Sequence, residues 1–176
     1  ALSNPTGKLL LVDANVVIHD VCSDVGKYRA KTSQDINLAG LAAENTLAIT
    51  VSTRDEVKSH IEFEMNFVRK TCEGKDWLDA SEVESTWKMR LEKWEQNHLV
   101  HVEIDNQDLE AIEKFYSGHV NVLEWIMTQK MERMNVSKKL RKLAQRENLL
   151  PEEGDRKMLA EAIGLRKTGK ELGILT

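Results

Sequence analysis

The sequence predicts an α/β fold built on a central, mostly parallel sheet of about four strands. Short apolar runs recur along the chain and alternate with longer stretches of helical periodicity, a pattern typical of parallel strands joined by right-handed crossovers. The run Leu9–Val12 is apolar without polar alternation, as expected for a strand buried on both faces. The composition, 41% hydrophobic and 31% charged with 2 Pro and 9 Gly, is typical of a helix-rich globular protein.

Length, charge and cysteine content limit the class of protein. A chain of 176 residues is long enough to bury a core, so we expect residues 1–176 to form a single domain. The net charge of −4 restricts any nucleic-acid-binding surface to a local patch. No run approaches the roughly 20 apolar residues of a membrane span, which predicts no membrane partner. No leader-like segment precedes Leu9, and Cys22 and Cys72 form no disulfide or metal framework, so a cytoplasmic location is expected.

The first half of the chain predicts two strands and three helices. A helix is expected over Ala14–Val25 and another over Ile36–Glu44, followed by a second strand over Leu47–Val51. Ser52 or Thr53 is expected to cap the third helix, whose first turn then carries Asp55 and Glu56. Apolar residues at helical spacing mark the buried face of that helix: Val57, Ile61, Met65 and Val68.

A larger helical section is expected over residues 72–150. Asp79-Ala-Ser-Glu starts one helix, in which Ser81 and Glu84 have capping-box spacing, and Leu99–Ile104 alternates as a third strand. Asp105 or Asn106 caps the next helical stretch, and Ser137 starts another that reaches Asn148. The buried stripe of the first of these helices is Val83, Trp87, Leu91 and Trp94. Apolar residues keep helical spacing along the later stretches: Leu109, Ile112, Phe115, Val122, Trp125, Ile126 and Met131.

Three carboxylates stand beside the predicted strands. Asp13 follows the first strand and Glu56 the second, while Asp155 begins a helix over Arg156–Leu165 that leads into a last strand at Gly173. In a parallel sheet all strand carboxyl ends lie on one edge, so these acids are expected to converge there. Each acid taken alone is equally well explained as a helix cap. Like charges that gather repel unless a cation offsets them, and carboxylate oxygens without His or Cys partners favour Mg²⁺ or Mn²⁺. Such ions activate water for phosphodiester hydrolysis.

These segments resemble the PIN-domain nucleases. Val12-Asp-Ala-Asn-Val-Val-Ile18 resembles the opening strand of that family with its first catalytic Asp, Thr53–Val57 resembles the segment of the second acid, and Glu153-Gly-Asp155 resembles that of the third. The resemblance covers about the first 70 and the last 30 residues, and residues 72–150 are then a helical insertion in a PIN-like domain. It implies a three-layer α/β/α fold and a metal-dependent endoribonuclease acting on RNA.

The same resemblance implies roles for individual residues. Asp13 and Asp155 would be metal ligands, Glu56 a further ligand or the group that orients water, and Asn15 a supporting polar contact with the substrate. The family places a fourth acid within a residue or two of Thr176, where this sequence ends. Many small members of the family pair up, which implies a homodimer or another protein partner.

A basic stripe in the predicted helix that begins at Ser137 is a candidate RNA contact. Lys and Arg neutralise backbone phosphates and release counterions. The alternative explanation of the stripe is an ordinary solvated helix face. Its residues are Lys138, Lys139, Arg141 and Lys142.

Two other functions are compatible with the sequence. One is a catalytically weak or inactive PIN-like module that binds RNA or protein, suggested by the lack of the fourth acid and by the helical insertion. The other is phosphoryl transfer through an aspartyl-phosphate on Asp13, which the Asn at position 15 disfavours because such a phosphatase places a partnering Asp there.

Overall fold

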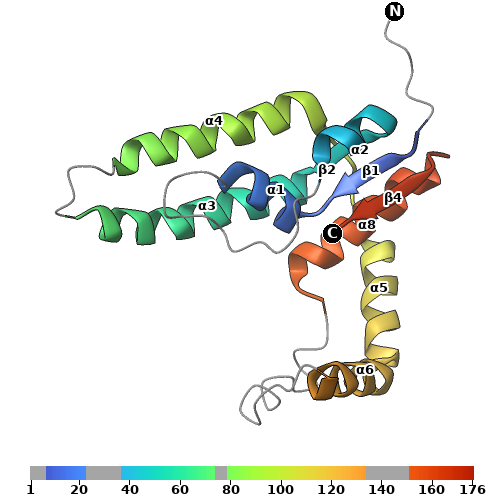
Figure 1. Cartoon of the computed structure of the whole chain (residues 1–176). Coiled ribbons are helices and arrows are strands. Elements are labelled where there is room, and N and C mark those ends of the chain that lie inside the picture. Colours follow the sequence, from blue (N-terminus) through green and yellow to red (C-terminus); the bar gives the residue numbers. More distant parts are fainter. Residues whose placement is uncertain (1–6, 23–36, 74–78, 134–150) are drawn as a thin grey trace, which may run out of the picture. The chain divides into compact units, whose positions relative to one another are not determined.

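The computed structural model describes residues 7–22, 37–73, 79–133 and 151–176 (Figure 1). This part of the chain holds four strands and seven helices. The chain divides into two compact units. We call residues Ala1–Val102 together with Leu165–Thr176 the sheet unit, and residues Glu103–Gly164 the helical unit.

The sheet unit contains one four-stranded sheet in which every described pair of strands is parallel. Its order is β3-β2-β1-β4, from β3 (Leu99–Val100), β2 (Thr46–Thr50) and β1 (Leu9–Val12) to β4 (Leu172–Leu175). The predicted α/β class with a parallel sheet is therefore confirmed. The first two connections move the chain outward from β1 to β2 and β3, and the last returns it to the other side of β1. This reversal is the strand order of a doubly wound three-layer fold, in which ligands bind at the carboxyl ends of the strands where the direction changes.

Strand β3 is shorter than its sequence pattern predicts. The alternation over Leu99–Ile104 predicted six residues, but only Leu99 and Val100 pair, with Ile49 and Thr50 of β2. Strand β2 ends at Thr50 because α3 begins at the next residue, so no ladder partner exists beyond that point. A strand needs a neighbour's backbone groups, which side-chain alternation alone does not supply.

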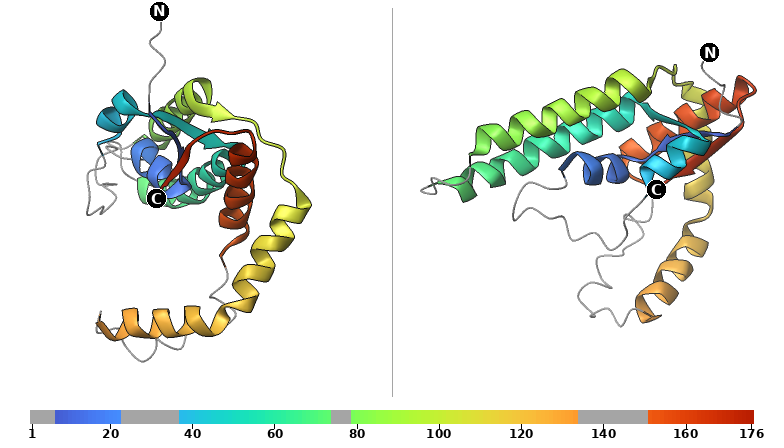
Figure 2. Two further views of the ribbon diagram at one scale, coloured as in Figure 1. Left: turned by 90° about the vertical axis from the view of Figure 1, so that its right-hand side faces the viewer. Right: turned by 45° about the horizontal axis from the view of Figure 1, so that its top comes forward.

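Three helices of the sheet unit pack against one another: α1 (Ala14–Cys22), α3 (Val51–Cys72) and α4 (Ala80–His98). Figures 1 and 2 show α3 and α4 as an antiparallel pair that continues past the sheet in the direction in which β1 points. The 22 residues of α3 rise about 33 Å, roughly twice the length of the five-residue β2. The short helix α2 (Leu38–Glu44) precedes β2 and is capped by the side chain of Asn37.

The core of the sheet unit lies where these helices meet β1 and β2. Both predicted helical stripes are buried there, as their spacing indicates. The buried stripe residues are Val57, Ile61, Met65 and Val68 of α3, with Val83, Trp87, Leu91 and Trp94 of α4.

Both predicted caps of these helices are wrong. Helix α3 is capped by Thr50, whose hydroxyl accepts a hydrogen bond from the amide of Thr53 at 3.3 Å, and not by Ser52 or Thr53. The helix thus begins at Val51, and its first turn carries no acid. The cap is the last strand residue because the chain turns directly from β2 into α3, which leaves no loop residue for the role.

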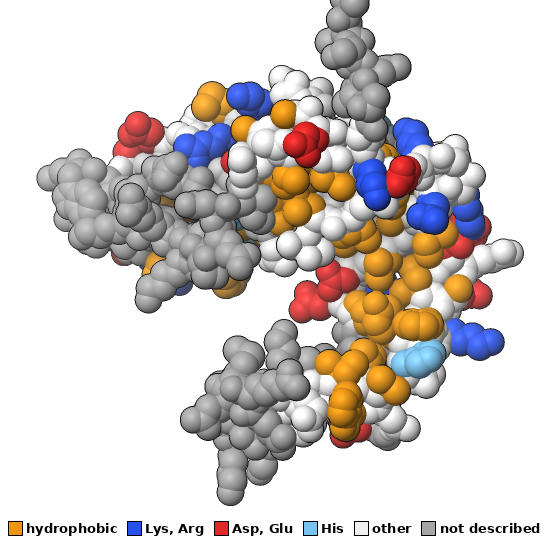
Figure 3. All heavy atoms as spheres, turned by 45° about the vertical axis from the view of Figure 1, so that its right-hand side comes forward, with side chains coloured by type: hydrophobic (Ala, Val, Ile, Leu, Met, Phe, Trp, Pro, Cys, Tyr) orange, Lys and Arg blue, Asp and Glu red, His pale blue; other side chains and the backbone are white. Residues whose placement is uncertain are grey.

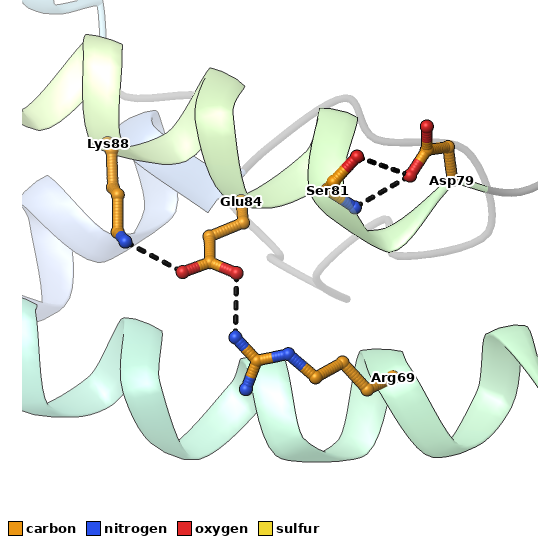
Figure 4. A network of polar contacts seen from close by, with 5 residues as sticks. All are labelled: Arg69, Asp79, Ser81, Glu84 and Lys88. Carbon is orange, nitrogen blue, oxygen red and sulfur yellow. Dashed lines mark hydrogen bonds and ion pairs between the residues drawn. The ribbon is translucent and has the colours of Figure 1, made fainter.

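Helix α4 is capped by Asp79 rather than by Ser81. The carboxylate of Asp79 accepts hydrogen bonds from the amide of Ser81 at 2.8 Å and from its hydroxyl at 2.6 Å, and these bonds lower the pKa of Asp79 (Figure 4). Glu84, expected to close a capping box, instead lies 2.7 Å from both Arg69 of α3 and Lys88 of α4. With Asp79 as the cap, Glu84 is the fifth residue of α4 and not the third, the position from which a capping-box side chain reaches the amide of the cap residue.

The helical unit contains α5 (Asn106–Gly118), α6 (Val120–Arg133) and most of α8 (Glu153–Lys167). Asp105 caps α5 by accepting from the amide of Gln107 at 2.9 Å, as one of the two predicted alternatives. Within this unit Arg156 of α8 forms an ion pair with Glu113 of α5.

Several of the apolar residues at helical spacing on α5 and α6 are exposed. Ile112 is buried, but Phe115 is 58% and Trp125 65% exposed. Figure 3 shows hydrophobic side chains gathered over these two helices. We define the exposed residues Phe115, Val122, Trp125 and Ile126 as the apolar patch of the helical unit. Such clusters mark interaction surfaces more often than isolated apolar residues do.

None of the helices in the described ranges is both long enough and apolar enough to cross a lipid bilayer.

Candidate functional site

Asp13 lies at the carboxyl edge of the sheet, at the point where the strand order reverses. It follows β1 directly, and its amide donates a hydrogen bond to the carbonyl of Leu175 in β4 at 2.8 Å. Continuing the registers of β1 with β2 and β4 by two residues and one residue places Thr50 and Thr176 beside Asp13. This edge therefore combines one carboxylate with threonine side chains from both neighbouring strands.

The Asp13 side chain is half-buried and is held from within α1. Its Oδ2 atom accepts a hydrogen bond from Nδ2 of Asn15 at 3.3 Å. The Asp13 carbonyl accepts from the amides of Val16 and Val17, at 3.1 Å and 3.2 Å, so its backbone begins the helix as the cap interpretation predicts. Within the described part of the chain, the Asp13 carboxylate accepts from the side chain of Asn15 and not from an amide of the first turn. Asn15, predicted as a polar contact with the substrate, thus contacts the carboxylate of Asp13.

Thr50 and Thr53 form a buried hydroxyl pair at the same edge, which sequence analysis did not single out. Their exposed fractions are 0% and 3%, and their Oγ1 atoms lie 3.2 Å apart. The run Leu47–Val51 read as an uninterrupted β segment, which obscured the cap. The sequence signal for this cap was a threonine at the predicted strand-to-helix junction, followed by a second threonine three residues later.

Glu56 lies in the second turn of α3, not in the first as predicted. It is exposed and belongs to the same unit as Asp13. The displacement follows from the earlier helix start, which moves every α3 residue further along the helix from the sheet edge. Asp55 beside it receives both hydrogen bonds that Arg54 donates to it, at 2.8 Å and 2.9 Å.

Asp155 is the third residue of α8 and belongs to the helical unit. The helix was predicted from Arg156 but begins at Glu153, so Asp155 is an exposed first-turn residue and not a residue preceding the helix. Carboxylates in this turn interact favourably with the helix dipole.

No three His, Cys, Asp or Glu side chains within the described ranges lie close enough together to hold a metal ion. Asp13 and Glu56 are therefore not members of such a set. Asp13 nevertheless supplies hard oxygen donors of the kind that Mg²⁺ and Mn²⁺ prefer. Mg²⁺ is often held by one or two protein carboxylates, with waters and substrate phosphates completing its shell, so the residues at this edge fit part of a magnesium site.

The predicted RNA-contacting residues Lys138, Lys139, Arg141 and Lys142 lie outside the described residues, as does the predicted helix that carries them.

The sheet unit also contains a pocket of about 480 Å³ between α1, α2, α4 and β2, which sequence analysis missed. The indole nitrogen of Trp94 donates to Oδ2 of Asp20 at 2.7 Å in its wall. Nδ1 of His98 lies 3.2 Å from the carbonyl oxygen of Leu47. The lining residues are Asp20, Leu38, Ala39, Ala42, Leu47, Arg90, Lys93, Trp94, Asn97 and His98. Polar residues at positions 90, 93, 97 and 98 share one face of α4, the only trace of this pocket in the sequence.

Cys22 is buried at the end of α1. Burial raises the pKa of its thiol to about 12, and the charge of Glu64 adds to the increase while Arg90 opposes it. A thiol with this pKa is almost entirely protonated at neutral pH, so Cys22 is unsuited to nucleophilic chemistry.

Comparison of the chain with protein-family models, with curated proteins and with solved structures finds no match.

Proposed function

We propose that this protein is a Mg²⁺- or Mn²⁺-dependent endoribonuclease of the PIN type. The single observation that supports the proposal best is the position of Asp13, a half-buried acid at the carboxyl end of β1, where the strand order reverses. Doubly wound sheets bind their ligands at this position.

Asp13 is the first metal ligand in this proposal, and Asn15 holds its carboxylate. The hydrogen bond from Asn15 occupies Oδ2 and restrains the carboxylate for coordination. A divalent ion bound there supplies Lewis-acid stabilisation and lowers the pKa of a water for attack on a phosphodiester. Glu56 and Asp155 are proposed as further acids of the reaction, on the basis of the sequence resemblance.

Cleavage of a fluorescent single-stranded RNA with and without Mn²⁺ or Mg²⁺ tests the proposal. Wild-type protein should cleave internally, and EDTA should stop the reaction. Asp13→Asn should reduce the rate by about a hundredfold or more, because loss of a metal ligand or its support lowers metal affinity or activity by factors of that order. The Asp13→Asn protein should keep its circular dichroism spectrum and its unfolding midpoint.

Matched variants separate the roles of the acids. Asp20→Asn removes a carboxylate seven residues further along the same segment but keeps an acceptor for Trp94, so cleavage should persist. Glu56→Gln is compared with its neighbour Asp55→Asn in α3, and only the former should slow cleavage. Asp155→Asn should slow cleavage as Asp13→Asn does. Metal-dependent cleavage that is unchanged in Asp13→Asn would refute the assignment.

A second candidate function is a catalytically weak or inactive module that binds RNA or protein. The apolar patch of the helical unit favours a protein contact, because Phe115, Val122, Trp125 and Ile126 are each about half exposed or more. Absence of cleavage by wild-type protein under all metal conditions, with RNA bound in a gel-shift experiment or with a homodimer in sedimentation analysis, would favour this candidate.

A further inference from the structure

We propose that the pocket between α1, α2 and α4 binds a small nucleotide, with its phosphate at the basic side chains of α4 and its base beside His98. The pocket lies wholly within the sheet unit, and the proposal does not depend on the nuclease assignment. The pocket is open to solvent, and its volume of about 480 Å³ falls in the range of small-molecule binding sites.

The charge of the lining favours an anion. Arg90 and Lys93 contribute two positive charges and Asp20 one negative charge, a net charge of +1. Arg90 Nη1 donates to the carbonyl of Val21 at 3.0 Å, which fixes the guanidinium near the pocket wall. Lys93 is exposed, so its ammonium group can reach a phosphate without leaving the helix surface.

The aromatic part of the lining favours a planar base. The imidazole of His98 contacts the indole of Trp94 with ring centroids 4.9 Å apart and ring planes tilted by 54°, and its Nδ1 lies 3.2 Å from the Leu47 carbonyl oxygen. These two contacts hold the ring in place. Restrained aromatic rings of this kind stack nucleobases in RNA-binding proteins.

The remaining lining residues select a base rather than an aliphatic acid. Asn97 donates its Nδ2 to the carbonyl of Lys93 at 2.9 Å, which orients the amide and leaves its oxygen as an acceptor for a base amino group. Ala39 and Ala42 of α2 form part of the wall opposite α4, and their small side chains leave room for a flat ring. A mononucleotide combines the anionic, planar and amino features that this lining addresses.

Isothermal titration calorimetry of the intact chain with adenosine 5′-monophosphate, in EDTA, tests the proposal. The nucleotide should bind more weakly to Lys93→Glu by about tenfold or more, the loss expected for a charge-assisted hydrogen bond. Asn97→Ala should weaken binding severalfold. Lys114→Glu, the same charge change on α5, should leave the affinity unchanged, and so should Asp13→Asn.

Adenosine and inorganic phosphate serve as partial probes. Each should bind at least about tenfold more weakly than the monophosphate if both ends of the pocket contribute. If inorganic phosphate binds as tightly as the nucleotide, the proposed role of His98 is wrong. If adenosine binds as tightly as the nucleotide, the proposed role of Lys93 is wrong. No heat of binding at about 1 mM nucleotide, or equal affinity in Lys93→Glu, would overturn the proposal itself.

Binding of AMP that persists in Lys93→Glu while cleavage is lost in Asp13→Asn would reject the pocket and support the nuclease. The reverse combination would reject the nuclease and support the pocket.

Discussion

Trp94 of α4 donates its indole N–H to Oδ2 of Asp20 in α1 at 2.7 Å, which joins two helices 74 residues apart in the sequence. The indole is 7% exposed, so the N–H depends on this carboxylate for a partner within the described structure. The bond links the core of the sheet unit to the wall of its pocket.

Asp20→Ala should lower the free energy of unfolding by about 1–3 kcal/mol, because a buried donor loses its acceptor. Asp20→Asn should cost less, because the amide oxygen still accepts from the indole. Urea denaturation followed by circular dichroism measures both values. Glu92→Gln, an exposed carboxylate on α4, is the control and should change stability by no more than about 0.5 kcal/mol. Equal stability of wild type and Asp20→Ala would show that the bond is not needed.

Thr50→Val should destabilise the protein by about 1–2 kcal/mol, because valine keeps the shape of the side chain but cannot cap α3. Thr50→Ser should retain most of the cap. Thermal unfolding of the two variants separates capping from packing, since Thr50→Ser loses a methyl group and Thr50→Val loses only the hydroxyl. A larger loss for Thr50→Ser would mean that Thr50 acts through packing alone.

Glu84→Gln should make the free energy of unfolding less dependent on pH in the acidic range. Hydrogen bonds from Lys88, and next from Arg69, lower the pKa of Glu84 below its ordinary value of 4.5. The stabilisation is therefore fully present at pH values above the ordinary pKa and is lost as the pH falls through the lowered pKa of the folded state.

The expected difference between wild type and Glu84→Gln at pH 7 is modest, about 0.2–1 kcal/mol, because Arg69 and Lys88 are largely exposed. It should shrink on acidification below about pH 4 and in about 1 M salt, which screens exposed pairs. Denaturant titrations over a pH series, with Glu92→Gln in parallel, measure the effect. A difference that grows on acidification would mean that these hydrogen bonds do not favour the ionised form of Glu84.

Cys22 should react slowly with iodoacetamide in the folded protein. At pH 8 a thiol of pKa about 12 is about one part in ten thousand ionised, and the thiolate is the reacting form. Cys72→Ser leaves Cys22 as the sole cysteine of the chain, so mass spectrometry of that variant reports on Cys22 directly. Labelling should become fast in urea. Rapid labelling without denaturant would mean that the thiol is neither buried nor protonated as described.

Local pattern was sufficient to predict much of the sheet unit. The strand Leu9–Val12 was predicted with its observed bounds, and the buried faces of α3 and α4 were predicted residue by residue. Both results follow from hydrophobic periodicity, which can be seen within a short segment of the sequence. The parallel arrangement followed in turn from the alternation of strands with helices.

Helix starts and strand ends were predicted less well. Thr50 and Asp79 cap α3 and α4 two or three residues before the expected capping residues. Strand β3 ends at Val100 because β2 ends at Thr50 and offers no further residue to pair with. Several side chains nearby had the chemistry of a cap. Which of them meets the first free amides depends on where the preceding segment turns, and this is set by packing.

Some residues of the candidate site were predicted from the sequence, and others were found only in the structure. The sequence suggested Asp13, Asn15, Glu56 and Asp155, and the structure places Asn15 in contact with Asp13. Glu56 and Asp155 remain predictions as ligands. The buried Thr50 and Thr53, and the pocket lined by Asp20, Lys93 and His98, required three-dimensional contacts because their members come from separate segments.

By itself, the amino-acid sequence determined that this protein has an α/β fold with parallel strands, and it determined which faces of α3 and α4 are buried. Those properties depend on the order of apolar and polar residues along one segment. Only the tertiary structure decided that β4 pairs beside β1, that Leu175 accepts from the amide of Asp13, and that residues of α1, α2 and α4 line one open pocket. These depend on which distant segments meet, because backbone hydrogen bonds and side-chain packing are completed only when the partner is in place.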